Sequence, residues 1–219
     1  TIRCGYEESE AAVSEKRKLN RSEMTSLVCI LLSVALWYFG YNAVTSKYAV
    51  YAPNILQKDY NLTMLIAQGA AIIAYLPAGM IASKIGRKKT ILIGVTLLAV
   101  SFGAASFMNV GSPAWLMYIL FALAGIAWAT INVNSFPMVV EMCSGADVGK
   151  YTGFYYTASM AAQTLTPMLS GWLMDEMGMT VLFPYSAIFV VLAFVTMCMV
   201  RHGDVKAESK TGLEAFDND

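Results

Sequence analysis

The chain has 219 residues, of which 57% are hydrophobic and 14% are charged, and its formal net charge is zero. A water-soluble domain of this size needs more polar side chains to cover its surface, so the composition excludes that class and predicts a membrane protein. The balanced charge gives no sign of a nucleic-acid partner. Because the chain opens on a polar stretch without a cleavable signal pattern, we expect a piece of a longer protein.

Six apolar stretches are long enough to cross a bilayer, which takes about 20 residues of helix. In chain order, the expected transmembrane helices cover residues 25–51, 64–85, 90–108, 114–140, 152–174 and 180–200. The loops between them are short and rich in Gly and Pro. The predicted fold class is therefore an all-α membrane protein. Its expected domains are a cytoplasmic linker (1–23), a six-helix transmembrane domain in the lipid bilayer (24–200) and a cytoplasmic tail (201–219).

The cations are distributed unevenly between the two sides of this predicted topology. If the first segment is cytoplasmic, thirteen of the fifteen Lys and Arg residues lie on the cytoplasmic side, and only Lys47 and Lys58 lie outside. This asymmetry predicts that both termini are cytoplasmic, and we expect a multi-pass protein of the plasma membrane. Lys47 is expected to extend its ammonium group towards the outer headgroups. A role in substrate binding is the alternative for Lys47.

An internal repeat is visible in the expected helices. Residues 79–86 and 171–178 both fit the pattern G-x-x-x-[SD]-[KE]-x-G, near the ends of the second and fifth helices. A Trp followed by an Asn also recurs, as Trp37 and Asn42 in the first helix and as Trp128 and Asn132 in the fourth. Since each unit has an odd number of helices, the second unit must be inverted in the membrane, as in many transporters. The alternative is chance recurrence of short glycine patterns.

The stretch 79–89, G-M-I-A-S-K-I-G-R-K-K, resembles the loop signature G-x-x-x-D-[RK]-x-G-[RK]-[RK] of the major facilitator superfamily, in the copy between helices 8 and 9. The resemblance implies the C-terminal six-helix half of a twelve-helix transporter. The N-terminal half would then be a partner in the same chain or in a second one. Residues 37–44 and 132–141 are more loosely similar to the sucrose and glycoside symporter branch.

The resemblance also implies a gating role for one group of residues: Gly79, Ser83, Gly86, Arg87, Lys88 and Glu141. Ser83 stands where the family usually has an acid, so this copy is expected to close the cytoplasmic side more weakly, although a serine can still cap backbone N–H groups. Glu141 ends the fourth expected helix on the side of Arg87. The resemblance predicts an ion pair between them, and an ordinary interfacial acid is the alternative.

Polar side chains within the expected helices are concentrated in the first, second, fourth and fifth, and burying them in a bilayer is costly without a function. These four helices are therefore predicted to line a wet cavity. The candidate substrate-binding residues are Trp37, Tyr41, Asn42, Gln68, Trp128, Asn132, Asn134, Tyr156 and Gln163. Aromatic rings beside amides suit a sugar, whose hydroxyl groups donate and accept hydrogen bonds. Alternatively, the amides tie the helices together.

An enzyme is disfavoured, because the single histidine, His202, lies in the tail and no catalytic or cofactor-binding motif is present. No cofactor or metal is expected. The predicted function is half of a secondary active transporter that moves a small polar solute by alternating access, with a sugar or glycoside and H⁺ or Na⁺ as the first candidates. No acid lies mid-membrane, so a coupling carboxylate would lie in the other half. The alternative is a non-transporting membrane scaffold or assembly subunit.

Overall fold

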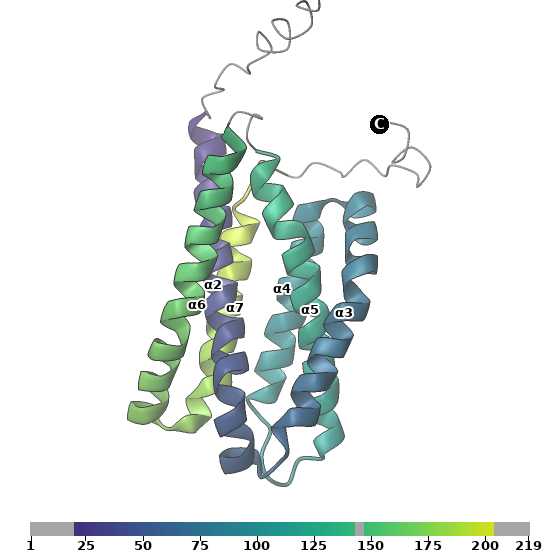
Figure 1. The fold of residues 1–219 in the computed structure, drawn as a ribbon, viewed down its shortest axis with the longest axis vertical. Coiled ribbons are helices and arrows are strands. Elements are labelled where there is room, and N and C mark those ends of the chain that lie inside the picture. Colours follow the sequence, from purple (N-terminus) through teal and green to yellow (C-terminus); the bar gives the residue numbers. More distant parts are fainter. Residues whose placement is uncertain (1–19, 143–146, 204–219) are drawn as a thin grey trace, which may run out of the picture.

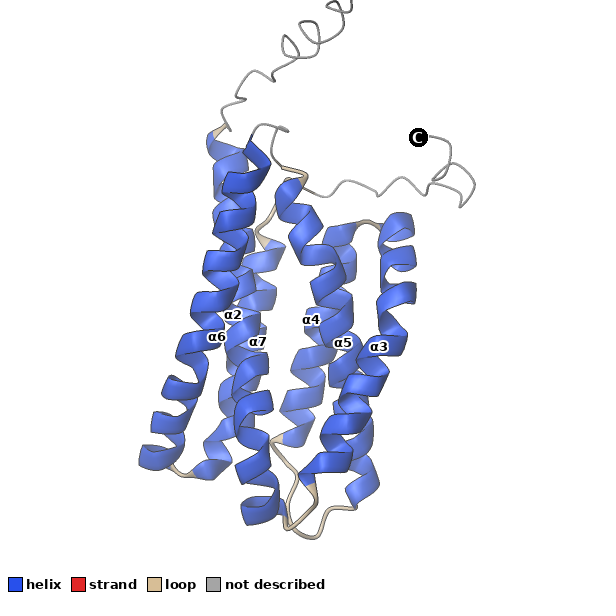
Figure 2. Cartoon of the chain, viewed as in Figure 1, coloured by secondary structure: helices blue, strands red, loops and turns tan. Residues whose placement is uncertain are grey.

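The computed structural model describes residues 20–142 and 147–203, which form long helices joined by short turns (Figure 1). The helices are α2 (Arg21–Tyr51), α3 (Tyr60–Ile85), α4 (Arg87–Ala105), α5 (Ala114–Val140), α6 (Val148–Met177) and α7 (Leu182–Cys198). A π-helical turn, η1 (Ala52–Leu56), extends α2, and a 3-10 turn, η3 (Met179–Val181), precedes α7. Figure 2 shows only helices and loops in this part of the chain, which confirms the all-α prediction. Most of the predicted linker and tail lies outside the described residues.

Helices α2 and α3 begin earlier than their apolar stretches predict, and polar residues cap their first turns. Asn20 and Glu23 form a capping box at the start of α2, four residues before the expected beginning. At the start of α3, the Asp59 side chain accepts a hydrogen bond from the Asn61 backbone N–H. Capping satisfies backbone donors that have no partner within the helix. Polar residues that hydrophobicity assigns to loops therefore belong to helices.

Five helical segments are long and apolar enough to cross a membrane by length and composition: Arg21–Leu56, Tyr60–Ile85, Arg87–Ala105, Ala114–Val140 and Met179–Cys198. The sixth expected span, α6, has 30 residues, but it is not apolar enough to belong to this group. It runs beside the other helices from one end of the bundle to the other (Figure 1). Its lower hydropathy comes from Tyr, Thr, Ser and Gln side chains, the kind of residue expected in a helix that faces a wet cavity.

The helices pack in a pattern that repeats between the two halves of the chain. α2 packs mainly on α6 and α7, α5 packs mainly on α3 and α4, and α4 and α7 pack on each other. Exchanging α2 with α5, α3 with α6 and α4 with α7 leaves these pairings unchanged. In Figure 1, α2 starts at the end of the bundle where α5 finishes, so the two units run in opposite directions. The predicted pair of inverted three-helix repeats is confirmed.

The two glycine motifs end α3 and α6 with the same backbone conformation. Gly86 has φ 97° and ψ 151°, and Gly178 has φ 90° and ψ 158°. This region of backbone space is essentially restricted to glycine, which explains why both motifs end in that residue. The two turns lie at opposite ends of the bundle (Figure 1). We call these the Arg87 end, which also holds the start of α2, and the Gly178 end.

Close packing of α3 against α5 depends on small side chains. The buried residues of α3 are Thr63, Ala67, Ala71, Ala74, Ala78 and Ala82. A Cβ atom on Gly125 of α5 would overlap the backbone carbonyl of Ala67. In a bilayer, where lipid is as apolar as the side chains, close backbone approach supplies the van der Waals contact that holds helices together. This packing fixes the positions of α3 and α5 beside the candidate site.

Several buried aromatic side chains form a core towards the Gly178 end. Phe183 of α7 lies 5.1 Å from Tyr51, 6.2 Å from Phe102 and 6.3 Å from Phe121, measured between ring centroids. Edge-to-face and tilted contacts of this kind are favourable beyond the area they bury. The core joins α2, α4, α5 and α7 and leaves α3 and α6 on the two flanks.

Candidate functional site

Hydroxyl and amide side chains connect α2, α5 and α6 midway along the bundle. The Tyr38 hydroxyl of α2 donates a hydrogen bond of 3.1 Å to Asn132 Oδ1 of α5. The hydroxyl groups of Ser135 in α5 and Tyr155 in α6 are hydrogen-bonded at 2.8 Å. Polar groups surrounded by lipid-facing helices need such partners. The three helices therefore meet at a polar centre.

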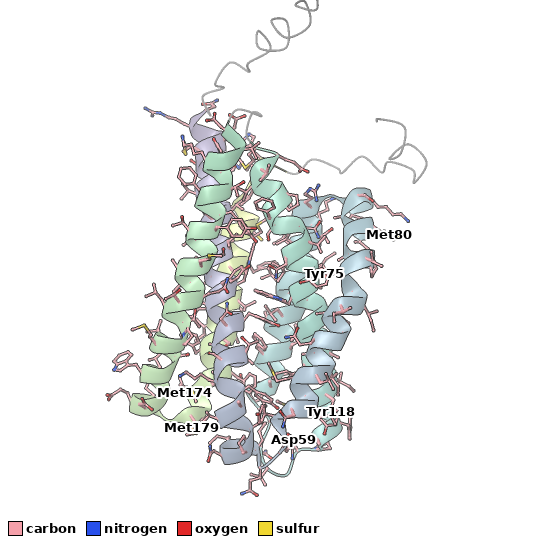
Figure 3. The ribbon with its side chains drawn as sticks, in the orientation of Figure 1. Asp59, Tyr75, Met80, Tyr118, Met174 and Met179 are labelled. Carbon is pink, nitrogen blue, oxygen red and sulfur yellow. The ribbon has the colours of Figure 1, made fainter. Side chains whose placement is uncertain are left out.

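Tyr75 adds α3 to this centre. Its side chain lies near those of Tyr38, Tyr41 and Tyr155. Figure 3 labels Tyr75 midway along α3, between the two ends of the bundle. Its side chain is 41% exposed, so it remains accessible from outside the described helices. Four helices thus contribute to one group of polar side chains, and their role as the walls of a cavity stays a prediction.

An aromatic stack lies beside the polar centre. The rings of Tyr41 in α2 and Trp128 in α5 are 3.8 Å apart at the centroids and nearly parallel, with an interplanar angle of 4°. Tyr38 meets the Trp128 ring edge-on at 5.0 Å. Aromatic faces next to hydroxyl and amide groups can pack on the apolar face of a solute while polar groups bind its edges.

The predicted contact residues differ in accessibility. Gln68, Tyr156 and Gln163 are exposed; Asn42, Trp128 and Asn132 are partly buried; and Tyr41 is 8% exposed. Trp37 and Asn134 are fully buried, and this corrects their expected place on a cavity wall. Each helical residue turns the side chain by about 100°, so Trp37 points away from Tyr38, and Asn134 points away from Asn132.

The three candidate asparagines make the same local hydrogen bond. The amide groups of Asn42, Asn132 and Asn134 donate to the backbone carbonyls of Tyr38, Trp128 and Thr130, each four residues earlier, at 2.8–3.0 Å. Asn132 also accepts from Tyr38, so it joins two helices, as the alternative interpretation expected. For Asn42, the described residues offer no partner to its Oδ1 atom, which leaves an acceptor for a solute.

Four residues of the polar centre were not among the sequence candidates: Tyr38, Tyr75, Ser135 and Tyr155. The sequence could have indicated Tyr38, because it precedes the candidate Asn42 by four residues and so lies on the same helix face. Tyr75 likewise follows Gln68 by seven residues on α3. Ser135 has no such signal, because a serine in an apolar helix usually bonds only to its own backbone. Only its contact with Tyr155 reveals a role.

At the Arg87 end, the expected ion pair is present. Nε of Arg87 donates to both carboxylate oxygens of Glu141 at 3.0 Å, and its terminal nitrogen lies 2.5 Å from Oε1. The side chains are 13% and 29% exposed, so water screens the pair only in part. Two-point contact between a guanidinium and a carboxylate fixes their geometry as well as their distance. The pair joins the start of α4 to the end of α5, and its gating role stays a prediction.

Two other residues of the gating stretch have local contacts. Lys88 Nζ donates to the carbonyls of Cys198 and Val200, at 3.2 and 2.6 Å, and so caps the C-terminal end of α7. Ser83 Oγ donates to the Met80 carbonyl in its own helix at 2.8 Å. No cap of a neighbouring helix by Ser83 is found among the described residues.

The first glycines of the two motifs occupy equivalent places. A Cβ on Gly79 of α3 would lie 3.7 Å from Val133 of α5. A Cβ on Gly171 of α6 would lie 2.9 Å from the Lys47 ammonium nitrogen of α2. Each motif therefore begins where the second helix of one repeat meets the first helix of the other. The contact is apolar in one copy and charged in the other.

Comparison with known proteins identifies the family. A family model described as Major Facilitator Superfamily matches residues 17–216, nearly the whole chain. The chain belongs to the major facilitator superfamily. The family and the apolar helices support a multi-pass membrane protein. Within the described residues, no group of three or more His, Cys, Asp or Glu side chains is placed to hold a metal ion.

Among curated members of the superfamily, the chain is 25% identical over 160 residues to "MFS-type transporter ppzB" of Metarhizium rileyi, which covers 72% of this chain and 32% of that protein. It is 23% identical over 155 residues to "Multidrug resistance protein MdtH" of Yersinia pestis, covering 69% of this chain and 37% of that protein. The chain thus spans about a third of the length of these relatives.

Solved structures show the same fold. A bacterial homologue of the human drug peptide transporters PepT1 and PepT2 superposes with a TM-score of 0.73 at 16% identity, over 86% of this chain and 45% of that chain. The human organic anion transporter MFSD10 (TETRAN) gives 0.62 at 14% identity, over 84% and 49% respectively. At these identities the likeness establishes the architecture of half a superfamily transporter and does not extend to cargo.

Proposed function

We propose that this chain is the C-terminal six-helix half of a secondary active transporter that moves a small polar organic solute by alternating access. The chain covers about half of the superfamily structures it superposes on, which supports an N-terminal six-helix partner, in the same polypeptide or in a second one. In such folds, substrate binds near the middle of the membrane, between repeats. The proposed location is the plasma membrane, with both termini cytoplasmic.

This proposal rests above all on the convergence of polar and aromatic side chains from α2, α3, α5 and α6 near the middle of the bundle. Tyr38 and Asn132 are hydrogen-bonded there, and Tyr41 stacks on Trp128 beside them. α4 and α7 contribute no Asn, Gln or charged side chain away from their ends. A cavity between two halves requires polar side chains on the helices that line it, and here they come from α2, α3, α5 and α6 and not from α4 and α7.

For the cargo, we propose a sugar or a glycoside as the first class to test. A flat aromatic stack beside amide and hydroxyl groups, with the Oδ1 atom of Asn42 as an acceptor, can hold a ring through its C–H face and its hydroxyl edges. The driving ion would be H⁺ or Na⁺. Because the described helices carry no acid away from their ends, the carboxylate that binds the ion would lie in the N-terminal half.

The gating proposal concerns the Arg87 end. The Arg87–Glu141 ion pair would help to hold this end closed and would break when the cavity opens towards the cytoplasm. Gly79 and Gly86 would allow the α3–α4 turn to pack closely, with Lys88 fixing the end of α7. In the proposed cycle, the charge contacts determine which end opens more easily.

A non-transporting scaffold would share the fold but would not need solute at its polar centre. The test is solute counterflow into vesicles that contain the full-length protein, with a radiolabelled panel of a sugar, a glycoside and a dipeptide. We expect saturable exchange of one class, lost in Trp128→Leu and retained in Trp172→Leu, a control whose ring is 58% exposed. Absence of exchange for every solute, or equal loss in both variants, would contradict the proposal. Flux that does not saturate would indicate a channel.

A further inference from the structure

Lys47 is a charged side chain well inside the membrane-spanning part of the chain. It lies in the continuous helical segment Arg21–Leu56, nine residues before its end, which corresponds to about 14 Å. The helix α2 itself ends four residues after Lys47, at Tyr51, whereas all other charged residues of the six described helices lie within two residues of a helix end. A charge at this depth is costly, and such residues usually face a cavity or a partner.

The ammonium group of Lys47 points across to α6. Its nitrogen lies against Gly171, where the missing side chain leaves room for it, and Gly171 is seven residues or about 10 Å before the end of the motif at Gly178. Met174, one turn beyond Gly171, marks this part of α6 in Figure 3. Lys47 thus makes a contact between helices, and its expected reach to the outer headgroups stays a prediction.

No carboxylate is paired with Lys47 within the described residues. The ion pair of Arg87 with Glu141 lies at the opposite end of the bundle. Asp175, one turn beyond Gly171, is exposed. The neighbouring Ser170 is 2% exposed, and its Oγ has no hydrogen-bond partner in this part of the chain. The Lys47 ammonium group thus lies against Gly171, and the residue before Gly171 in α6 carries a buried hydroxyl without a partner in the described residues.

The position of Gly171 on α6 connects Lys47 to the candidate site. Tyr156, Gln163 and Gly171 follow spacings of seven and eight residues, which place them along one face of the helix. Tyr156 and Gln163 are both exposed, so this face is open within the described bundle. The Lys47 ammonium group therefore lies at the Gly178 end of the same open face.

We propose that Lys47 binds a carboxylate at the Gly178 end of the transport cavity. This inference rests on the proposed function and narrows its substrate class: if the carboxylate belongs to the cargo, the cargo is an anionic solute such as a sugar acid or a glycoside of one. The same chemistry can come from a carboxylate of the N-terminal half that approaches Lys47 when this end closes. In either case, the partner supplies the negative charge that pairs with the Lys47 ammonium group. Ser170, the residue before Gly171, is a further hydrogen-bond donor in this part of α6.

The test uses phenyl glucuronide and phenyl glucoside, which differ by a carboxylate in place of a hydroxymethyl group. Their binding to the purified full-length protein is read from the rise in thermal unfolding midpoint with concentration. We expect the glucuronide to raise the midpoint at about tenfold lower concentration than the glucoside. A charge-assisted hydrogen bond strengthens binding by about this factor. Lys47→Gln should remove this preference, and Lys47→Arg should keep it.

A second measurement distinguishes the source of the carboxylate. A cysteine introduced by Met177→Cys reports on the Gly178 end through its rate of thiol labelling without solute. If the N-terminal half supplies the carboxylate, Lys47→Gln will change this rate and leave the preference between the two phenyl glycosides untouched. Either response supports the assignment.

The proposal is overturned if Lys47→Gln changes neither the glycoside preference nor the labelling rate while the wild-type protein transports solute. It is also overturned if Asp175→Asn reproduces the effect of Lys47→Gln, because the carboxylate would then be a local one. If the wild-type protein transports nothing in the counterflow panel, the proposed function itself fails. The transport measurement therefore separates the two failures.

Discussion

The two ends of the bundle have the same backbone turn but different charge contacts. At the Arg87 end, the residue after Gly86 is Arg87, which pairs with Glu141, and Lys88 caps α7. At the Gly178 end, the residue after the equivalent glycine is Met179, and the acids of that motif, Asp175 and Glu176, are exposed. No ion pair is found at the Gly178 end among the residues that the structure describes.

The repeat determines the backbone conformation of the two turns but not the charges of their side chains. The backbone conformations of Gly86 and Gly178 agree within 10° in both φ and ψ, because the same helix-to-helix turn is built twice. Side chains on that turn are not constrained in this way, so charges could be placed at one end alone. A transporter needs its two ends to open at different times, and unequal contacts on equal turns can provide that.

The largest expected effect tests the part that the two ends share. Gly86→Ala and Gly178→Ala each place a side chain in a backbone region that only glycine adopts readily, at a cost of roughly 1–3 kcal/mol. Because the dihedral angles match, we expect both variants to lower the thermal unfolding midpoint in detergent by similar amounts.

The control for this prediction is Gly103→Ala, which has no atom within 4 Å of the added Cβ and lies within a helix. It should leave the midpoint nearly unchanged, because alanine is the better helix former. A loss confined to Gly86→Ala would mean that the two turns are not equivalent in energy.

A smaller effect tests the part in which the ends differ. Glu141→Gln removes a partly exposed ion pair, worth about 1 kcal/mol, and should shift the population open at the Arg87 end by about fivefold. Thiol labelling of Ser83→Cys, carried out in a background without the four native cysteines, measures this shift. Asp175→Asn is the matched change at the other end and should leave the rate unchanged, because Asp175 has no ion pair within the described residues. Equal shifts in both variants would contradict the assigned asymmetry.

Much of the fold could be predicted from the sequence because it depends on long-range regularities. The positions of the apolar stretches fixed the number and order of helices, and the recurrence of the Gly79 motif at Gly171 indicated inversion. Helix starts could not be placed from hydrophobicity, since Asn20 and Asp59 act through hydrogen bonds to backbone donors. Likewise, the turn between α3 and α4 consists of Gly86 alone, where a charged loop was expected.

The candidate site was less predictable because it depends on which way each side chain turns. The amides pointed to α2, α3, α5 and α6 as the helices of a cavity, and this choice stays a prediction. Residue type could not tell that Trp37 is in the core and Tyr38 in the polar centre, since neighbours on a helix face different ways. The ion pair of Glu141 was predictable through family resemblance, whereas the contact of Lys47 with Gly171 required the packing of α2 on α6.

The smallest expected effect concerns the helix cap at the Arg87 end. Lys88→Met removes the ammonium group that binds two free carbonyls after α7, an interaction worth about 0.3–1 kcal/mol near a helix C-terminus. Lys89→Met removes the same charge from an exposed neighbour and serves as the control. A lower unfolding midpoint in Lys88→Met alone would show that the cap stabilises this end independently of the ion pair. If both variants behave alike, only the total positive charge matters here, and the difference between the two ends reduces to Arg87 and Glu141.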